Sequence, residues 1–336
     1  MKAAFDPHMI GHSLLVQYLF APSFSSDIVI LSVAALAVIF AAIVNFPYFS
    51  REWEKWKVRR ALRRFLSPEA VKKILDNPDV TRVRGQEKEL TVLFSSIRGF
   101  TSLADELSPT ALVDLLNEYF SEMTDVIFKH EGVLDKYIGD AIMAFWGAPY
   151  PHEDHAVRAC RAALEMQQVM IKLQNHWEQQ GRPRLEIGVG INTGTMYVGL
   201  IGSKKRCEFT IMGANVNLAA RLEGITNQYG THLMIGETTY EAVRKEMLAR
   251  ELDIVRLKGK VKPVKIFELV GTLAEADQHR NRIDRFGRGL RAYREENWAV
   301  ALEIFEALVR DYPGDRPSRL YANRCHDSLH LPPQGV

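Results

Sequence analysis

The order of strand-like and helix-like segments after residue 89 constrains the fold more than any other feature of this sequence. Apolar runs typical of buried strands alternate there with two long segments whose apolar residues recur at helical spacing. These segments lie at residues 90–94, 110–129, 133–138, 141–146, 154–177 and 185–192. The order β-α-β-β-α-β predicts a ferredoxin-like α+β core.

Further segments extend this predicted core. Strands are expected at residues 196–200, 209–212, 233–235 and 264–269, and helices at 216–229 and 237–247. Together they predict one domain over residues 86–272.

The N-terminal part contains a segment of a different character. Residues 28–44 are apolar except for Ser32, and extension to Phe49 gives about the 20 residues that a bilayer core requires. Lys and Arg greatly outnumber Glu directly after it, which predicts that the chain beyond residue 50 is cytoplasmic. We therefore predict a membrane anchor over 1–50 with a transmembrane helix at about 28–49. A buried core helix is the alternative, although such a helix is seldom apolar on every face.

Two other regions flank the predicted domain. Residues 51–85 read as a helical stalk and linker, with a helix start at Ser67-Pro68. Residues 276–336 read as a helical tail, in which NWAVALEIFEALVRDYPGD resembles one tetratricopeptide-like helix pair. A single such unit cannot bury its own apolar face, so we expect it to pack on the domain or on a partner chain.

Composition excludes several classes of function. The net charge of +2 over 336 residues gives no basic footprint for nucleic acid. The three cysteines, Cys160, Cys207 and Cys325, are few and far apart, which fits a reducing compartment rather than a disulfide framework.

The stretch TVLFSSIRGFT, residues 91–101, predicts a phosphate-handling corner. A buried strand breaks there into a short loop, and a helix begins near Phe100, an arrangement that points backbone N–H groups at an anion. Nucleotide sites usually also need a carboxylate for Mg²⁺, but this strand ends in Ser95 and Ser96.

Two further pairs of side chains are candidates for chemistry. Lys136 and Asp140 flank a predicted hairpin turn, where they form either a plain salt bridge or part of a site. Asn217 and Arg221 are four residues apart on one helix, so they share a face that suits a developing phosphate charge. The plain alternative is a surface arginine and an ordinary helix-start asparagine.

The motifs as a set resemble one family. FSSIRGFTSLAD, DKYIGDAIMAFWGAP, GINTG, TIMGANVNLAARLE and LKGK occur in the order found in class III nucleotidyl cyclases, the adenylyl and guanylyl cyclases. The resemblance covers about residues 89–270. It implies a cyclase catalytic domain that pairs head to tail, so that two chains share each active site. The anchor and stalk resemble bacterial members, which implies the bacterial inner (plasma) membrane with the catalytic domain in the cytoplasm.

The resemblance also implies a role for each matching residue. Ser96 and Asp140 stand at the two positions of metal-binding aspartates, and two Mg²⁺ or Mn²⁺ ions per site are expected. Backbone groups of Ile97, which also faces the metal, and of Gly99, Phe100 and Thr101 hold the phosphates. Lys136 and Thr210 read adenine from the other chain, Asn217 and Arg221 position ribose and stabilise the transition state, and Lys258 with Lys205 or Arg206 binds the triphosphate. Guanylyl cyclases resemble this pattern with an acidic residue at Lys136, so ATP is the expected substrate.

Serine at position 96 departs from the family pattern. A neutral hydroxyl cannot bridge two Mg²⁺ ions, so one metal is expected to bind weakly. Ala214 is a second departure, because many bacterial relatives carry aspartate there. Three interpretations remain: a homodimeric adenylyl cyclase that is slow or needs Mn²⁺, an ATP-binding pseudo-cyclase that acts as a membrane-tethered partner, or an engineered or erroneous serine in a competent enzyme. A heterodimer with a normal cyclase chain is also compatible with the sequence.

Overall fold

The computed structural model describes residues 85–203, 207–256 and 263–330, together with 30–31, 33–40 and 71. The chain divides into two compact units, Met1–Ala61 and Leu62–Val336, which are described separately. In the first unit, residues 33–40 are helical and their apolar side chains are exposed. Within the described residues, none of the helices combines the length and hydrophobicity needed to cross a bilayer. Most of the predicted span at 28–49 and of the stalk at 51–85 lies outside the described residues, as do Lys205, Arg206 and Lys258.

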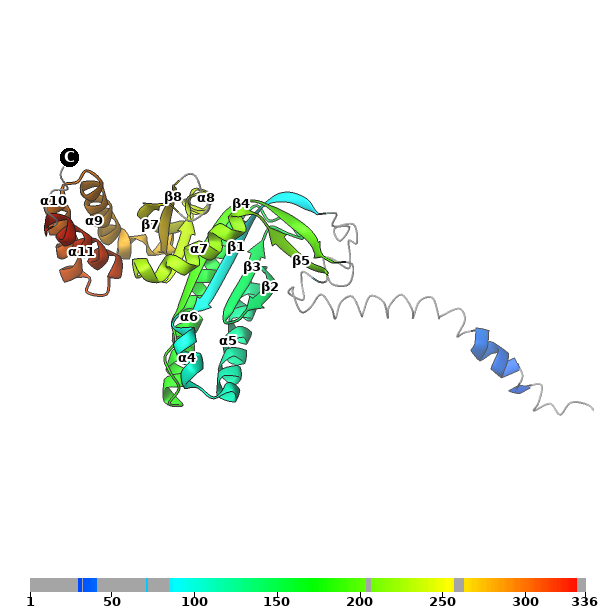
Figure 1. Ribbon diagram of the computed structural model, residues 1–336. Coiled ribbons are helices and arrows are strands. Elements are labelled where there is room, and N and C mark those ends of the chain that lie inside the picture. The colour runs from blue at the N-terminus through cyan, green and yellow to red at the C-terminus, as the bar shows by residue number, and fades with distance from the viewer. Residues whose placement is uncertain are drawn as a thin grey trace, which may run out of the picture. The chain divides into compact units, whose positions relative to one another are not determined.

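The second unit is built on one mixed β-sheet (Figure 1). Its first four strands are β1 (Gln86–Ile97), β2 (Val133–Ile138), β3 (Ala141–Trp146) and β4 (Ile187–Gly202). They lie in the order β2-β3-β1-β4, and β1 pairs antiparallel with both β3 and β4. This is the strand order of the split βαβ motif, and the predicted α+β class is confirmed.

Four more strands extend the sheet. β6 (Leu233–Gly236) pairs parallel with β4, and β8 (Val264–Thr272) and β7 (Met247–Val255) follow. β5 (Cys207–Met212) pairs with the far end of β4. Two predicted boundaries were wrong. Residues 185–192 and 196–200 belong to one strand, because pairing with β1 continues through Thr193 and Gly194. The predicted helix at 237–247 ends at Val243, and its last residue begins β7.

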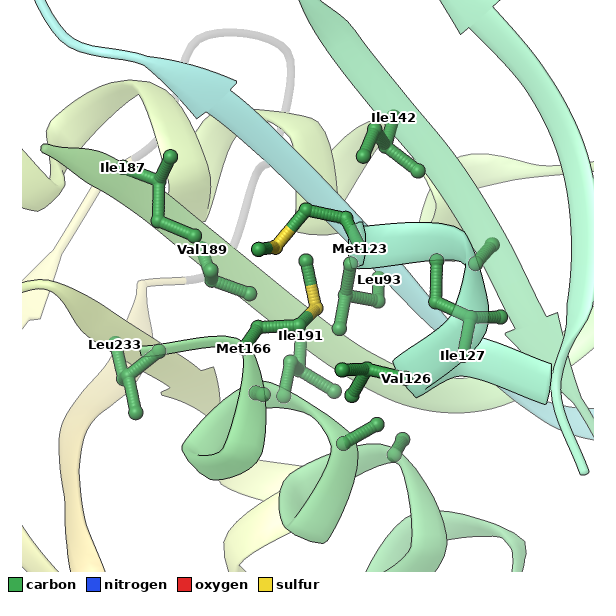
Figure 2. Packing of buried hydrophobic residues seen from close by; sticks show 14 of the residues in the cluster. Leu93, Met123, Val126, Ile127, Ile142, Met166, Ile187, Val189, Ile191 and Leu233 are labelled. Atoms are coloured by element: carbon green, nitrogen blue, oxygen red, sulfur yellow. The ribbon is translucent and has the colours of Figure 1, made fainter. Parts of the chain in front are cut away.

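Helices cover both faces of the sheet. α5 (Pro109–Lys129) and α6 (His155–Gln179) pack on one face. The Ser108 hydroxyl caps α5 by accepting a hydrogen bond from the Ala111 backbone N–H. The side chains of Leu93, Met123, Ile127, Met166 and Ile191 meet in this core (Figure 2). Each is fully buried, and such burial stabilises the fold by about 1.5–3 kcal/mol per large side chain. α7 (Ala214–Tyr229) packs on the other face, against β4 and β1.

The C-terminal helices α9 (Ala276–Arg294), α10 (Trp298–Asp311) and α11 (Arg316–His330) pack on the α+β domain itself. One apolar cluster joins Phe286, Phe305 and Tyr321 of these helices to Leu218 and Leu222 of α7. The C-terminal helices therefore pack against α7.

A buried ionic group links the same helices to the sheet. The Arg250 side chain on β7 is 1% exposed, and its guanidinium donates to Glu268 at 2.8 Å and to Asp315 at 2.8 and 2.9 Å. Because Asp315 directly precedes α11, Arg250 fixes the start of that helix.

Candidate active site

The strand–loop–helix corner forms at the end of β1. Gly99 has φ of +67° and precedes the short helix α4 (Phe100–Glu106), in a left-handed conformation that glycine adopts without a Cβ clash. Ser95 and Ser96 point to opposite faces of β1. The Ser95 hydroxyl lies 3.2 Å from the Tyr119 hydroxyl inside the core, so Ser96 is the serine that faces the corner.

Asp140 reaches this corner from the turn between β2 and β3. The turn residue Gly139 has φ of +64°, which allows the tight reversal after Ile138. The Ile97 backbone N–H donates to Asp140 Oδ2 at 2.8 Å. The structure thus brings Asp140 beside Ser96 and Ile97, which lie more than forty residues earlier in the sequence.

Glu223 on α7 occupies the same corner, and sequence analysis missed it. The Ser96 hydroxyl donates to Glu223 Oε1 at 2.5 Å. Burial raises the pKa of the Glu223 carboxyl, and the negative charge of Asp140 raises it further, whereas the Ser96 hydrogen bond and Arg98 lower it in part. A carboxylate therefore lies beside position 96 although the residue there is neutral.

Two glycines on β4 allow α7 to approach this strand closely. A Cβ on Gly190 would lie 2.2 Å from the Glu223 backbone nitrogen, and one on Gly188 would lie 3.1 Å from Glu223 Oε1. These two glycines were the signal in the sequence, because glycine in a strand marks a close approach of another element.

The donor set tests the expectation of two divalent metals. Asp140 supplies one carboxylate, Ile97 a backbone group and Ser96 only a hydroxyl, which is already engaged with Glu223. Over residues 85–203, 207–256 and 263–330, no group of three or more His, Cys, Asp or Glu side chains is arranged to hold a metal. These residues fit one oxygen-liganded divalent cation at Asp140, and they lack the second aspartate that would bridge two ions.

A second group of side chains forms around Asp135. A register shift in the β2–β3 pairing between Leu134 and Lys136 turns Asp135 inward, so that its side chain is only 1% exposed. The Thr210 hydroxyl on β5 donates to Asp135 Oδ2 at 2.6 Å. Lys136 Nζ lies 3.3 Å from Asp135 Oδ1 and donates to Glu208 at 3.1 Å.

The charges in this group compensate one another. Burial raises the pKa of the Asp135 carboxyl, and the Thr210 hydrogen bond and the Lys136 ammonium oppose that shift. Burial acts to lower the pKa of Lys136, but the two neighbouring carboxylates outweigh it and raise that pKa. The sequence pattern predicted site roles for Lys136 and Thr210 but not for Asp135, which joins them.

The remaining expected site residues lie on two helices. Asn217 is exposed on α7 and Arg221 is half-buried one turn later. Phe100 packs against the core, and Thr101 is exposed at the start of α4. Within the described ranges, a hydrogen bond from Thr210 and an ion pair with Lys136 meet on Asp135, and a hydrogen bond joins Ile97 to Asp140. These contacts connect neither set to Asn217 or Arg221.

Comparison with known proteins shows which family this domain resembles. Residues 83–271 match the family described as adenylate and guanylate cyclase catalytic domain. "Adenylate cyclase" of Anabaena cylindrica is 35% identical over 189 residues, which are 54% of this chain and 37% of that protein. "Adenylate cyclase 1" of Rhizobium meliloti (strain 1021) is 31% identical over 209 residues, 62% of this chain and 31% of that protein. This chain thus spans about a third of the length of these two relatives.

Solved structures show the same likeness. The adenylyl cyclase CyaB from P. aeruginosa aligns with a TM-score of 0.53 at 38% identity, over 56% of this chain and 96% of that one. The guanylyl cyclase Cya2 aligns with a TM-score of 0.51, also at 38% identity, over 56% of this chain and 94% of that one. An adenylyl cyclase and a guanylyl cyclase are thus similar to this chain to nearly the same extent.

Proposed function

Because the chain belongs to the family of adenylate and guanylate cyclase catalytic domains, we propose that it is an adenylyl cyclase that converts ATP to 3′,5′-cyclic AMP and pyrophosphate. One observation carries the choice of ATP. Lys136 and Thr210, expected to face the base, lie on different strands and meet on the same buried carboxylate of Asp135. A lysine ammonium is a donor, which suits the N1 acceptor of adenine and opposes the N1–H donor of guanine.

The proposed reaction is an intramolecular displacement. The ribose 3′-oxygen forms a bond to the α-phosphorus, the bond from that phosphorus to the bridging oxygen of pyrophosphate breaks, and the 3′-hydroxyl proton leaves to solvent. We expect Arg221 to stabilise the charge that develops on the phosphate oxygens, and Asn217 to position the ribose. Ile97, Gly99, Phe100 and Thr101 hold the phosphates, with Lys258 and Lys205 or Arg206 on the triphosphate.

A divalent cation, when bound, stabilises the charge of the triphosphate and of the attacking oxygen. Asp140 is the residue proposed to hold it, with the Ile97 backbone beside it. Ser96 leaves the position nearest the 3′-oxygen without its aspartate, so we expect slow turnover with Mg²⁺ and a preference for Mn²⁺. Glu223 is proposed as the nearest carboxylate able to take part of that role, because the Ser96 hydroxyl already contacts it.

The site is proposed to form between two copies of the chain. Large apolar side chains are exposed on β2 and β5, the strands that carry Lys136 and Thr210, and on β4, which pairs with β5. They include Ile138, Leu200 at 62% exposure and Met212 at 57% exposure. Several exposed apolar side chains on one domain are typical of protein–protein interfaces. A heterodimer, in which this chain lends Lys136, Asn217 and Arg221 to a partner with an intact metal site, would use the same surface.

Membrane attachment is part of the proposal. The apolar residues 28–49 followed by a basic stretch favour an anchor in a bacterial plasma membrane, with the catalytic domain in the cytoplasm. Fractionation of cells that express the full chain tests this, and release by high salt without detergent would contradict it.

The activity is tested by cyclic nucleotide formation from ATP and from GTP, with Mg²⁺ or Mn²⁺, by the full chain in detergent. We expect slow cyclic AMP formation with Mn²⁺, and an increase of about 10²–10⁴ in Ser96→Asp, the usual scale of activating a nucleophile. Arg221→Ala in the Ser96→Asp background is the inactive control.

The alternative function is an ATP-binding pseudo-cyclase, which Ser96 itself favours. No cyclic nucleotide formation by either the wild type or Ser96→Asp, together with Mn²⁺-dependent ATP binding, would support it. Silence together with no ATP binding would contradict both functions.

A further inference from the structure

We propose that Asp135 determines base specificity by fixing the direction in which the Thr210 hydroxyl donates its proton. This inference rests on the proposed function, in which Lys136 and Thr210 face the purine. It assigns to a buried residue, which does not itself touch the nucleotide, the role of a positioning residue for the base.

The geometry commits the hydroxyl proton. A threonine hydroxyl has one proton to donate and two lone pairs, whereas an ionised carboxylate only accepts. Thr210 Oγ1 lies 2.6 Å from Asp135 Oδ2, a distance typical of a hydrogen bond to a charged acceptor. The proton must therefore point at Asp135, and the lone pairs of Thr210 stay available to an outside donor.

Neighbouring groups favour the ionised, accepting form of Asp135 against the effect of its burial. Lys136 Nζ lies 3.3 Å from Oδ1, and the Ile211 backbone also contributes a hydrogen bond to the carboxylate. The bulge at this position turns the aspartate inward and leaves Lys136 beside it at the surface. Because the carboxylate is almost fully buried, water does not compete for its oxygens.

The resulting pattern matches one purine. Adenine offers an N6 amino donor and an N1 acceptor, which pair with an accepting Thr210 and a donating Lys136. Guanine reverses both groups, with an O6 acceptor and an N1–H donor. A mismatch at a buried polar pair costs about 1–3 kcal/mol, which corresponds to about 5- to 150-fold in affinity.

Asp135→Asn reverses the hydroxyl. The ammonium of Lys136 holds the amide oxygen on its side, so the NH₂ group faces Thr210 and donates to it. Thr210 then presents its own proton to the base, which favours the O6 of guanine. We expect the ratio of ATP to GTP affinity to fall by about 10- to 100-fold. The ratio is measured with the full chain by competition of each nucleotide against a fluorescent ATP analogue in Mn²⁺, so turnover is not required.

Asp253→Asn is the matched control. Asp253 Oδ2 also accepts a hydroxyl hydrogen bond, from Tyr229 at 2.7 Å, and pairs with a cation, Arg324 at 3.0 Å, away from the expected base contacts. This variant is expected to lower stability and to leave the nucleotide ratio within about 2-fold, because it changes the same chemistry elsewhere.

Thr210→Val tests whether Asp135 acts through the hydroxyl. In a double-mutant cycle, Asp135→Asn should change the ratio by less than about 2-fold once Thr210 is valine. Thr210→Ser keeps the committed proton and should keep the wild-type ratio, and it remains informative if Asp135→Asn does not fold.

Three results would overturn the inference: an unchanged ratio in Asp135→Asn, the same shift in the valine background, or loss of the ratio in Thr210→Ser. A wild type that binds both nucleotides equally removes this inference and leaves nucleotide binding intact. A wild type that binds neither nucleotide removes the proposed function as well.

Discussion

The two hydroxyl–carboxylate pairs described at the candidate active site differ in the charges around them. Thr210 donates to Asp135 at 2.6 Å, and Ser96 donates to Glu223 at 2.5 Å. Burial raises the pKa of both carboxyls. Asp135 has the Lys136 ammonium 3.3 Å away, whereas the charged neighbour that contributes most to the Glu223 shift is another carboxylate, Asp140.

The two pairs differ in charge balance: a cation lies beside the carboxylate of the first, whereas the second lacks such a cation among the described residues. The pair of Thr210 and Asp135, called here the base-side pair after its expected role, has the ammonium of Lys136 beside it. Its charges are therefore balanced before any ligand binds. The pair of Ser96 and Glu223, called here the phosphate-side pair, has the carboxylate of Asp140 near that of Glu223. Arg98 compensates these two negative charges only in part. A divalent cation would supply the missing charge, and serine at position 96 keeps the corner from holding a third carboxylate.

The largest effect on stability is expected at a third buried carboxylate, that of Asp315. It gives a reference for the smaller effects expected at Asp135 and Glu223. Arg250→Met removes the guanidinium from Asp315 and Glu268, and we expect a loss of about 3–5 kcal/mol because both charges stay buried. The free energy of unfolding is measured by urea titration of the second unit. Arg244→Met, which breaks an exposed pair with Glu241, is the control and should cost less than about 1 kcal/mol.

The stabilities of the wild type and of Arg250→Met should also depend differently on pH. Burial opposes ionisation of Asp315, but the hydrogen bonds and charge of Arg250 outweigh it and lower the pKa of this carboxyl. A lowered pKa contributes stability above the unfolded value of about 4, and that contribution is lost as the pH falls through the folded value. The stability gap between wild type and Arg250→Met should therefore narrow below about pH 4. A gap that widens on acidification would exclude Asp315 as its source.

A smaller effect is expected when the phosphate-side pair is given one more charge. Ser96→Asp sets a new carboxylate against Glu223, and we expect the protein without metal to lose about 2 kcal/mol, or about 4–8 °C in Tm. Mn²⁺ should restore more stability to this variant than to the wild type, because a cation binds the third carboxylate. Scanning fluorimetry measures both, and Ser96→Asn, neutral and of equal size, should show neither.

Removal of the cation from the base-side pair should make it resemble the other. Lys136→Met leaves Asp135 buried beside a neutral side chain, with an expected loss of about 1–2 kcal/mol. Lys172→Met on the exposed face of α6 is the matched control. Equal stability of the two variants, measured by urea titration, would show that Lys136 does not compensate Asp135.

The smallest effect is expected at Glu223. Glu223→Gln removes one of two neighbouring negative charges, so we expect the protein without metal to gain about 1 kcal/mol and its response to Mn²⁺ to weaken. Thermal melts with and without Mn²⁺ measure both quantities. Loss of stability in this variant would mean that the corner is already neutral and would remove the contrast between the two pairs.

Local patterns predicted the elements whose ends are marked by glycine. β2 and β3 were predicted to the residue, because Gly132, Gly139 and Gly147 bound two short apolar runs. β7 was missed because it contains Arg250, which reads as a surface residue. Its partners Glu268 and Asp315 are 18 and 65 residues away, so no local window contains the reason for its burial.

The sequence by itself determined the α+β class, the family and the absence of an aspartate at position 96, because periodicity and motif order are properties of residue order. Only the tertiary structure decided that Asp135 joins Lys136 to Thr210 and that Glu223 faces Ser96. The first follows from a register shift in a strand pair and the second from the approach of α7 to the glycines of β4. Both depend on how separate elements pack, and packing between distant segments has no local signature in the chain.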